Sequence, residues 1–128
     1  MKKILFVLCA AALLCSCTDD KAQKTAEGFL TGYLAMDYDT AVTFCDEAMA
    51  ANLLKATEGW QALDTLLLAR MKDAASKTRF EIASVDDETE KGTAHVRYLL
   101  YPMGSEHGHE MNMTLKKDGG KWLVSALR

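Results

Sequence analysis

The spacing of apolar residues changes once along this chain of 128 residues, near Thr78. Before that point apolar side chains recur every three or four residues, which is the period of an amphipathic helix. After it they alternate with polar ones, as in half-buried strands. Four such strands in succession form an antiparallel meander whose apolar face only the preceding helices can cover. The sequence therefore predicts an α+β fold, with N-terminal helices packed on one face of a curved four-stranded antiparallel sheet.

The first predicted helix carries an apolar stripe over residues 22–34. Gly28 and Gly32 lie four residues apart within it, and each weakens a helix by up to about 1 kcal/mol relative to alanine. We therefore expect both glycines to allow close approach of another element. A turn at residues 37–39 ends this helix, and its aspartates suit the cap of the next one.

Two further helical segments follow that turn. Residues 41–49 carry apolar side chains at the spacing of a buried helix face, and Cys45 is among them, so it is expected to be a core residue rather than a nucleophile. Residues 53–74 form a longer segment that Gly59 is expected to kink or divide. Its wide apolar face predicts contacts on more than one side.

Four strands are predicted over residues 80–85, 94–101, 110–116 and 122–127, the last two joined by a tight Asp-Gly-Gly turn. The side chains expected to face the helices are Ala94, Val96, Tyr98, Leu100, Met111, Met113, Leu115 and Val124. A bulge is predicted in the first strand, so Glu81 could point either toward the helices or away from them. The apolar side chains assigned to the opposite, outer face are Ala83, Val85, Leu99, Tyr101, Leu123 and Leu127. They form either an interface or a surface that the curling sheet buries itself.

The start of the chain has the organisation of a secretory signal. Lys2 and Lys3 precede an apolar run, residues 4–14, that is too short to cross a bilayer core of about 30 Å. The run ends in Leu14-Cys15-Ser16-Cys17, which resembles a bacterial lipobox. The resemblance implies cleavage before Cys17, a diacylglyceryl thioether on its sulfur and an acyl group, typically palmitate, on the new amino group. Cys15 is a poorer acceptor because the bulky Leu14 precedes it.

This reading divides the chain into a signal peptide (1–16), a lipidated cysteine with a short acidic tether (17–22) and one domain (23–128). Thr18 follows the acceptor where inner-membrane lipoproteins carry aspartate, so we expect a Gram-negative cell envelope and favour the outer membrane. Asp19 and Asp20 either signal export to the cell surface or form a solvated linker. The sequence does not decide between the periplasmic and the surface leaflet of that membrane.

Charge and cysteine content exclude several classes of function. The signal contains two of the 15 basic residues and none of the 18 acidic ones, so the mature chain carries a formal charge of −5. That balance argues against nucleic acid as a partner. Lysines also form no cluster in the sequence that would favour anionic headgroups. Cys45 is the single thiol left in the mature chain, so no intramolecular disulfide is expected.

Three segments resemble small bacterial lipoproteins with an uncharacterised nuclear-transport-factor-2-like (cystatin-like) domain. They are Ala-Glu-Gly-Phe-Leu at 26–30, Asp-Tyr-Asp-Thr-Ala at 37–41 and Gly-Lys-Trp at 120–122, with Met36 standing where these relatives usually carry glycine. The resemblance implies a cone of helices and sheet, and dimers that form through the outer sheet face. It also implies an apolar pocket near Tyr33, Trp60, Tyr98, Met111 and Met113. The same residues would fill an ordinary core equally well.

An isomerase or dehydratase of this fold would need an acid or histidine on the inward face, raised in pKa by burial. None of the inward positions carries one, and Tyr33 has no evident base beside it. His107 and His109 lie beside Glu106, and His95 could join them, but their spacing matches no strong metal-ligand pattern. We therefore expect no catalytic residue, metal or cofactor. The chain is predicted to be a non-enzymatic module that binds a small apolar ligand or an envelope protein, with a small isomerase or dehydratase as the alternative.

Overall fold

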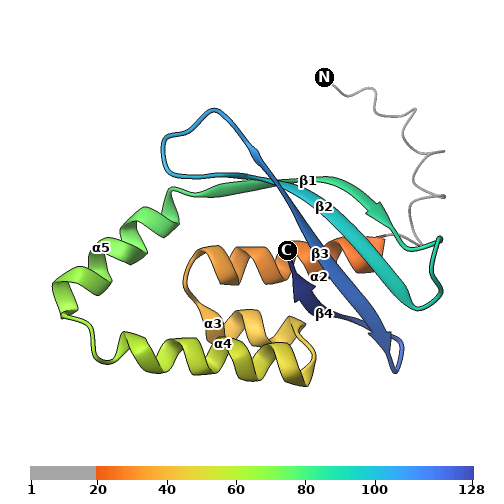
Figure 1. Ribbon diagram of the computed structural model, residues 1–128, viewed down its shortest axis with the longest axis horizontal. Helices are drawn as coiled ribbons and strands as arrows, with labels where there is room; N and C mark the ends of the chain where they lie inside the picture. The colour runs from red at the N-terminus through yellow and green to blue at the C-terminus, as the bar shows by residue number, and fades with distance from the viewer. Residues whose placement is uncertain (1–19) are drawn as a thin grey trace.

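The computed structural model describes residues 20–128, in which all the helices precede all the strands (Figure 1). The helical part comprises α2 (Asp20–Leu34), α3 (Tyr38–Ala41), the 3₁₀ turn η1 (Val42–Phe44), α4 (Glu47–Trp60) and α5 (Thr65–Ser76). The strands are β1 (Arg79–Asp86), β2 (Thr93–Tyr101), β3 (His109–Asp118) and β4 (Lys121–Leu127). The predicted signal peptide and the predicted lipidation site, Cys17, lie outside the described residues. Because α2 begins at Asp20, residues 20–22 of the predicted tether belong to its first turn.

The strands form one antiparallel meander in the order β1-β2-β3-β4, which confirms the predicted α+β class. Consecutive strands pair along most of their length, with Ala94 opposite Leu115, Tyr98 opposite Met111 and Leu115 opposite Val124. The sheet twists around α2, which lies along one of its faces (Figure 1). The predicted arrangement of N-terminal helices on one face of a curved sheet is therefore confirmed.

The core lies between α2 and this face of the sheet. The largest fully buried side chains come from α2, β2, β3 and β4 and are Phe29, Leu30, Val96, Met113, Leu115 and Val124. Ala22 and Ala26 are also fully buried, since small side chains let α2 lie close to the sheet. The apolar stripe predicted over residues 22–34 is the face of α2 that enters the core.

Two irregularities in strand register move apolar side chains from the outer face to the core. The pairing of β1 with β2 shifts between Ile82 and Ser84, and that of β3 with β4 shifts between Thr114 and Leu115. Each extra residue reverses the alternation beyond it. Val85 and Leu127 therefore pack against the core, and their predicted place on the outer face was wrong.

Glu81 precedes the irregularity in β1 and stays exposed, opposite Leu99 on the outer face. Its carboxylate accepts a hydrogen bond from the Tyr101 hydroxyl at 3.3 Å. The bulge that the sequence predicted is therefore real. It does not turn Glu81 inward.

The predicted helix over residues 41–49 is interrupted, because Asp46 starts a new helix. The Asp46 carboxylate accepts a hydrogen bond from the Met49 N–H at 2.8 Å and so caps α4. Its own N–H donates to the Val124 carbonyl at 3.0 Å, which holds Cys45 in an extended conformation beside β4. Cys45 is buried, as expected, but lies at an extended corner rather than on a helix face.

The long predicted segment over residues 53–74 is two helices. It divides after Trp60, near Gly59, and Asp64 caps α5 by accepting a hydrogen bond from the Leu66 N–H at 3.1 Å. Asp46 and Asp64 begin their helices in the same way, by satisfying an amide that has no partner within the helix. The chain therefore turns at 61–64, and α5 leaves the direction of α4.

The two glycines of α2 lie where α3 and η1 come closest. A Cβ on Gly28 would lie 2.5 Å from Cζ of Phe44, and one on Gly32 would lie 3.0 Å from the backbone N of Ala41. Both close approaches were predicted. Met36 ends α2 with a left-handed φ of 60°, while the Asp37 N–H donates to the Gly32 carbonyl at 2.8 Å. Glycine would adopt this left-handed conformation without strain. This explains why the lipoproteins that the sequence resembles usually carry glycine where this chain has Met36.

Candidate functional site

Helix α5 is the least integrated element of the fold. None of its residues is buried, and Leu66 and Leu67 are 59% and 46% exposed. In Figure 1 it stands away from α2 and connects the end of α4 to the start of β1. The sequence predicted contacts on more than one side of this segment. That prediction was wrong for α5 within one chain, because α5 leaves the direction of α4 at the turn.

Two adjoining cavities open between α5 and the rest of the molecule. The first, of about 300 Å³, is lined by Leu30, Thr31, Leu34, Ala35, Ala75, Ser76, Thr78, Arg79 and Phe80. The second, of about 490 Å³, is lined by Ala35, Met36, Asp37, Tyr38, Asp39, Thr57, Trp60, Gln61 and Lys72. Both include Ala35, so we treat them together as the α5 cleft. Their volumes fall in the range of small-molecule sites, about 300–1,000 Å³.

A row of aromatic rings runs from the core to the α5 cleft. Ring centroids are 5.2 Å apart for Phe29 and Tyr33, 5.4 Å for Tyr33 and Tyr38, and 4.8 Å for Tyr38 and Trp60. The first two pairs are stacked and the third is tilted, and such ring contacts add to the stability that burial provides. Burial and the neighbouring Tyr33 raise the pKa of Tyr38 to about 12. The Tyr38 phenol therefore stays protonated well into the alkaline range, with Tyr33 as the partner of its hydrogen bond.

The five residues of the predicted pocket fall into two groups. Tyr98 and Met113 are buried in the core, and Met111 and Tyr33 pack against it. Trp60 lies on the wall of the α5 cleft, where the aromatic row ends. Residues that sequence reasoning assigned to the core or left unassigned form the rest of the wall, namely Leu30, Leu34, Tyr38 and Phe80. Their apolar character was visible in the sequence, but the opening beside them was not.

Solved structures with the same architecture identify the fold. One, an NTF2-like protein of unknown function from Shewanella oneidensis MR-1, is 13% identical, with a TM-score of 0.56 over 85% of this chain and 99% of its own. The other, described provisionally as an NTF2-like transpeptidase from Campylobacter jejuni, is 18% identical, with a TM-score of 0.54 over 81% of this chain and 96% of its own. The chain has the NTF2-like fold. No family model matches it, and no curated protein matches it significantly.

Within this NTF2-like fold, two groups that could act as base or nucleophile are engaged in structural contacts, Asp37 on the cleft wall and Cys45 beside β4. The Asp37 carboxylate accepts hydrogen bonds from the Thr40 N–H at 3.3 Å and the Thr40 hydroxyl at 2.7 Å. The Cys45 thiol donates to the Ala41 carbonyl at 3.4 Å, and burial raises its pKa to about 12. A thiol with so high a pKa is almost entirely protonated at neutral pH and is a poor nucleophile.

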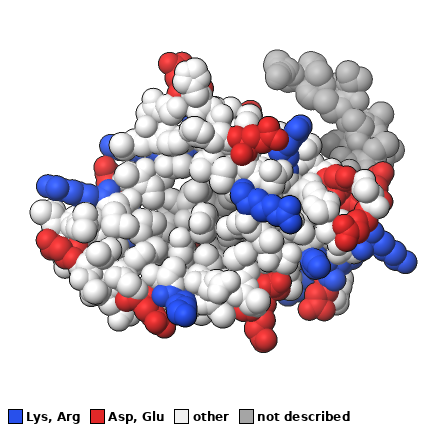
Figure 2. All heavy atoms as spheres, viewed as in Figure 1, with Lys and Arg blue, Asp and Glu red and all other residues white. Residues whose placement is uncertain are grey.

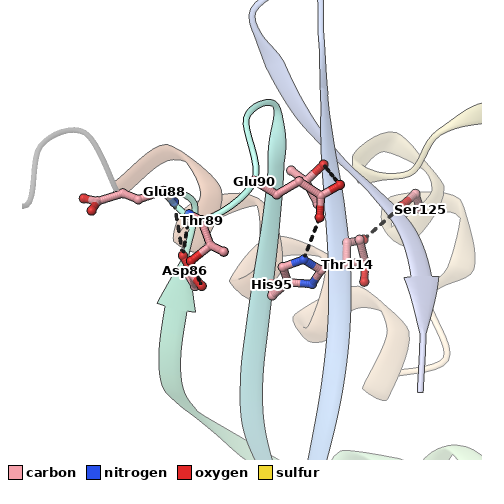
Figure 3. Close-up of polar contacts among 8 residues, drawn as sticks. Asp86, Glu88, Thr89, Glu90, His95, Thr114 and Ser125 are labelled. Carbon is pink, nitrogen blue, oxygen red and sulfur yellow. Dashed lines mark hydrogen bonds and ion pairs between the residues drawn. The ribbon is translucent and has the colours of Figure 1, made fainter.

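The histidines lie on the sheet and its β2–β3 connection. His109 pairs with Leu100, while His95 pairs with Thr114 and approaches Glu90, with 3.4 Å between Nε2 and Oε1 (Figure 3). Across residues 20–128, no three His, Cys, Asp or Glu side chains are grouped to hold a metal ion.

The acidic turn between β1 and β2 is held by its own hydrogen bonds. The Asp86 carboxylate accepts from the Thr89 hydroxyl at 2.7 Å and from the amides of Glu88 and Thr89 at 3.1 Å each (Figure 3). These donors stabilise the ionised form and lower the pKa of Asp86. The turn is therefore a hydrogen-bonded loop of charged residues on the surface.

The outer sheet face retains a smaller apolar surface than predicted. Leu99, Tyr101 and Leu123 are half-buried, and the Arg79 guanidinium lies 4.0 Å from the centroid of the Tyr101 ring. A Cβ on Gly108 would lie 2.9 Å from the same ring, so the β2–β3 connection also covers it. The chain thus covers part of the face through which a homodimer was predicted. The dimer stays a prediction.

Proposed function

We propose that this chain is a lipid-anchored module of a Gram-negative cell envelope, attached by Cys17 and favouring the outer membrane, that binds a small apolar ligand in the α5 cleft. The lipobox-like start of the sequence supports the attachment. Among residues 20–128, none of the helices combines the length and the apolar character that a membrane span requires. An acyl anchor would supply the membrane attachment, and two or three chains make such an anchor stable.

The observation that carries the binding role is the shape and lining of the α5 cleft. Its base is formed by Leu30, Leu34 and Phe80, while Trp60 and Tyr38 extend the apolar wall toward α4. The remainder of the lining is polar or charged and includes Thr31, Ser76, Asp37, Lys72 and Arg79. A ligand would therefore place its apolar body against the aliphatic and aromatic side chains and its few polar groups against this remainder. Because α5 has no buried residue, it can move to admit a ligand at little cost in packing.

The competing proposal, a small isomerase or dehydratase, would need a carboxylate or histidine with a raised pKa facing Tyr33. Asp37 is instead a helix cap, and its carboxylate accepts hydrogen bonds from the amide and the hydroxyl of Thr40. The provisional transpeptidase description of one structural neighbour does not transfer either. Acyl transfer needs an activated nucleophile, and the raised pKa of Cys45 opposes that role. The geometry therefore favours binding over catalysis.

Filling the cleft should block ligand binding. We expect the mature chain to bind the uncharged apolar fluorophore N-phenyl-1-naphthylamine, and Ala35→Trp, at the junction of the two cavities, to weaken binding roughly tenfold or more through lost apolar contact. Ala69→Trp, on an exposed position of α5, is the matched control and should bind as wild type does. Fluorescence titration measures both. Equal binding by all three proteins would contradict the proposed site.

Attachment to the membrane is tested separately on Cys17. In cells fed an alkyne analogue of palmitate, the wild-type protein should be labelled and recovered with the membranes. Cys17→Ser should lose both the label and the membrane recovery, whereas Cys15→Ser should keep them. Label retained by Cys17→Ser, or lost from Cys15→Ser alone, would mean that the lipobox assignment is wrong.

A further inference from the structure

Two pairs of lysines from opposite ends of the described sequence lie at one end of the fold. Lys21 and Lys24 lie on the first turns of α2, while Lys117 and Lys121 belong to the hairpin of β3 and β4. A groove of about 430 Å³ separates the two segments and is lined by Lys21, Lys24, Thr25, Thr43, Phe44, Gly120, Lys121, Trp122 and Leu123. We call it the lysine groove. It is separate from the α5 cleft, with which it shares no lining residue.

The floor of the lysine groove is apolar. Trp122 is only 8% exposed, and Phe44 and Leu123 are half-buried beside it. The Lys117 ammonium lies 5.6 Å from the centroid of the Trp122 ring, on the adjoining strand. Ammonium groups around an aromatic floor match a ligand that joins an anionic oxygen group to an apolar body. A phospholipid headgroup with the start of its acyl chains has this composition.

The position of the groove relative to the anchor identifies the occupant. Cys17 lies three residues before Asp20, the first residue of α2. An extended chain spans at most about 3.6 Å per residue, so a lipid on Cys17 keeps the start of α2 within roughly 10 Å of the bilayer surface. Lys21 and Lys24 stand on that first part of the helix. This step rests on the proposed lipidation of Cys17.

Charge at this end of the molecule also favours one orientation. The β1–β2 and β3–β4 turns lie at the same end of the meander, and Figure 2 shows acidic and basic side chains at that end of the molecule. Residues 86–91 at the β1–β2 turn contain four acidic side chains and one lysine, whereas residues 116–121 at the β3–β4 turn contain three lysines and one aspartate. An anionic bilayer would repel the first turn and attract the second.

We propose that the lysine groove binds the phosphate headgroup of an anionic phospholipid in the membrane that holds the anchor. Binding there would turn the β4 edge of the domain toward the bilayer and the acidic turn away from it. The attraction is local, because charges more than a Debye length of about 8 Å apart are screened at physiological ionic strength. The overall negative charge of the mature chain therefore does not prevent it.

Co-sedimentation with vesicles tests the proposal without the anchor. The protein is the mature chain from residue 17 with Cys17→Ser, which retains the whole core described above. The vesicles are phosphatidylcholine alone and phosphatidylcholine with about one-third phosphatidylglycerol. We expect binding to the anionic vesicles only, and Lys21→Gln/Lys121→Gln to weaken it roughly 30-fold. Lys55→Gln/Arg70→Gln removes the same charge from exposed positions on α4 and α5 and should bind as the unsubstituted chain does.

Equal losses in the two double variants would overturn the proposal, since the attraction would then follow net charge alone. Equal binding to both vesicle types would also overturn it, because both lipids carry a phosphate and the uncompensated negative charge of phosphatidylglycerol would then not be recognised. Circular dichroism checks that both variants remain folded. If Cys17 proves unlipidated but the groove variant still loses binding, the groove stands and only the proposed anchor fails.

Discussion

Phe29→Ala is expected to lower the free energy of unfolding by about 3–5 kcal/mol, because it removes a fully buried ring between α2 and the sheet. The ring also stacks on Tyr33, with centroids 5.2 Å apart, so the substitution interrupts the aromatic row at its buried end. Chemical denaturation followed by circular dichroism measures the change. A loss of this size would make the α2–sheet contact the main source of stability for the domain.

Leu67→Ala is the matched control, since it also truncates an apolar helix residue but at a 46% exposed position of α5. We expect a change within about 0.5 kcal/mol, as for most surface substitutions. A loss near that of Phe29→Ala would mean that a second chain or a bound ligand covers α5 in solution. A small loss for Phe29→Ala itself would contradict the position of α2 in the core.

The type and order of the elements could be predicted because the buried side chains are apolar and recur in the sequence with the period of a helix or of a strand. The stripe on residues 22–34 and the alternation along 94–101 each specify one face, and those faces meet in the core as predicted. Gly28 was also informative. Glycine lowers the stability of a helix relative to alanine, so its presence indicates that a neighbouring element needs the space that a side chain would fill. The contact with Phe44 supplies that need.

Details that depend on a single backbone irregularity could not be predicted in the same way. A shift of one residue in β3–β4 pairing turned Leu127 inward, and the extended conformation of Cys45 depends on an amide of Asp46 reaching β4. Both follow from hydrogen bonds between segments that the local pattern does not connect. The bulge in β1 was anticipated, but its consequence for Val85 was not.

The two candidate sites were hidden for a related reason. The apolar residues of α5 and of residues 53–60 read as one wide face, and only the turn at 61–64 separates α5 from the body and opens the cleft. The lysine groove joins Lys21 to Lys121, which are 100 positions apart, so no stretch of sequence contains a basic cluster. A site assembled across two elements leaves little trace in either element alone.

Stability is expected to fall as the pH rises above 9. Burial raises the pKa of Cys45 from about 9 to about 12 and that of Tyr38 from about 10 to about 12, and it raises the pKa of Tyr98 as well. In this range the unfolded chain loses these protons while the folded chain keeps them. The unfolded state is therefore favoured, by up to about 1.4 kcal/mol per pH unit for each fully shifted group. Tyr38 contributes less than this, because its side chain is partly exposed.

Cys45→Ala separates the thiol from the tyrosines. Between pH 9 and pH 10 the larger part of the wild-type slope is expected to come from Cys45, because the tyrosines of the unfolded chain are at most half ionised there, so the variant should lose clearly less stability per pH unit than the wild type. Urea denaturation at half-unit steps of pH measures the slope, which does not depend on what the variant loses at neutral pH. Equal slopes for the two proteins below pH 10 would show that the Cys45 thiol ionises as readily in the folded chain as in the unfolded one. That result would remove the contribution of Cys45 to the alkaline sensitivity and the argument that burial keeps this thiol from acting as a nucleophile.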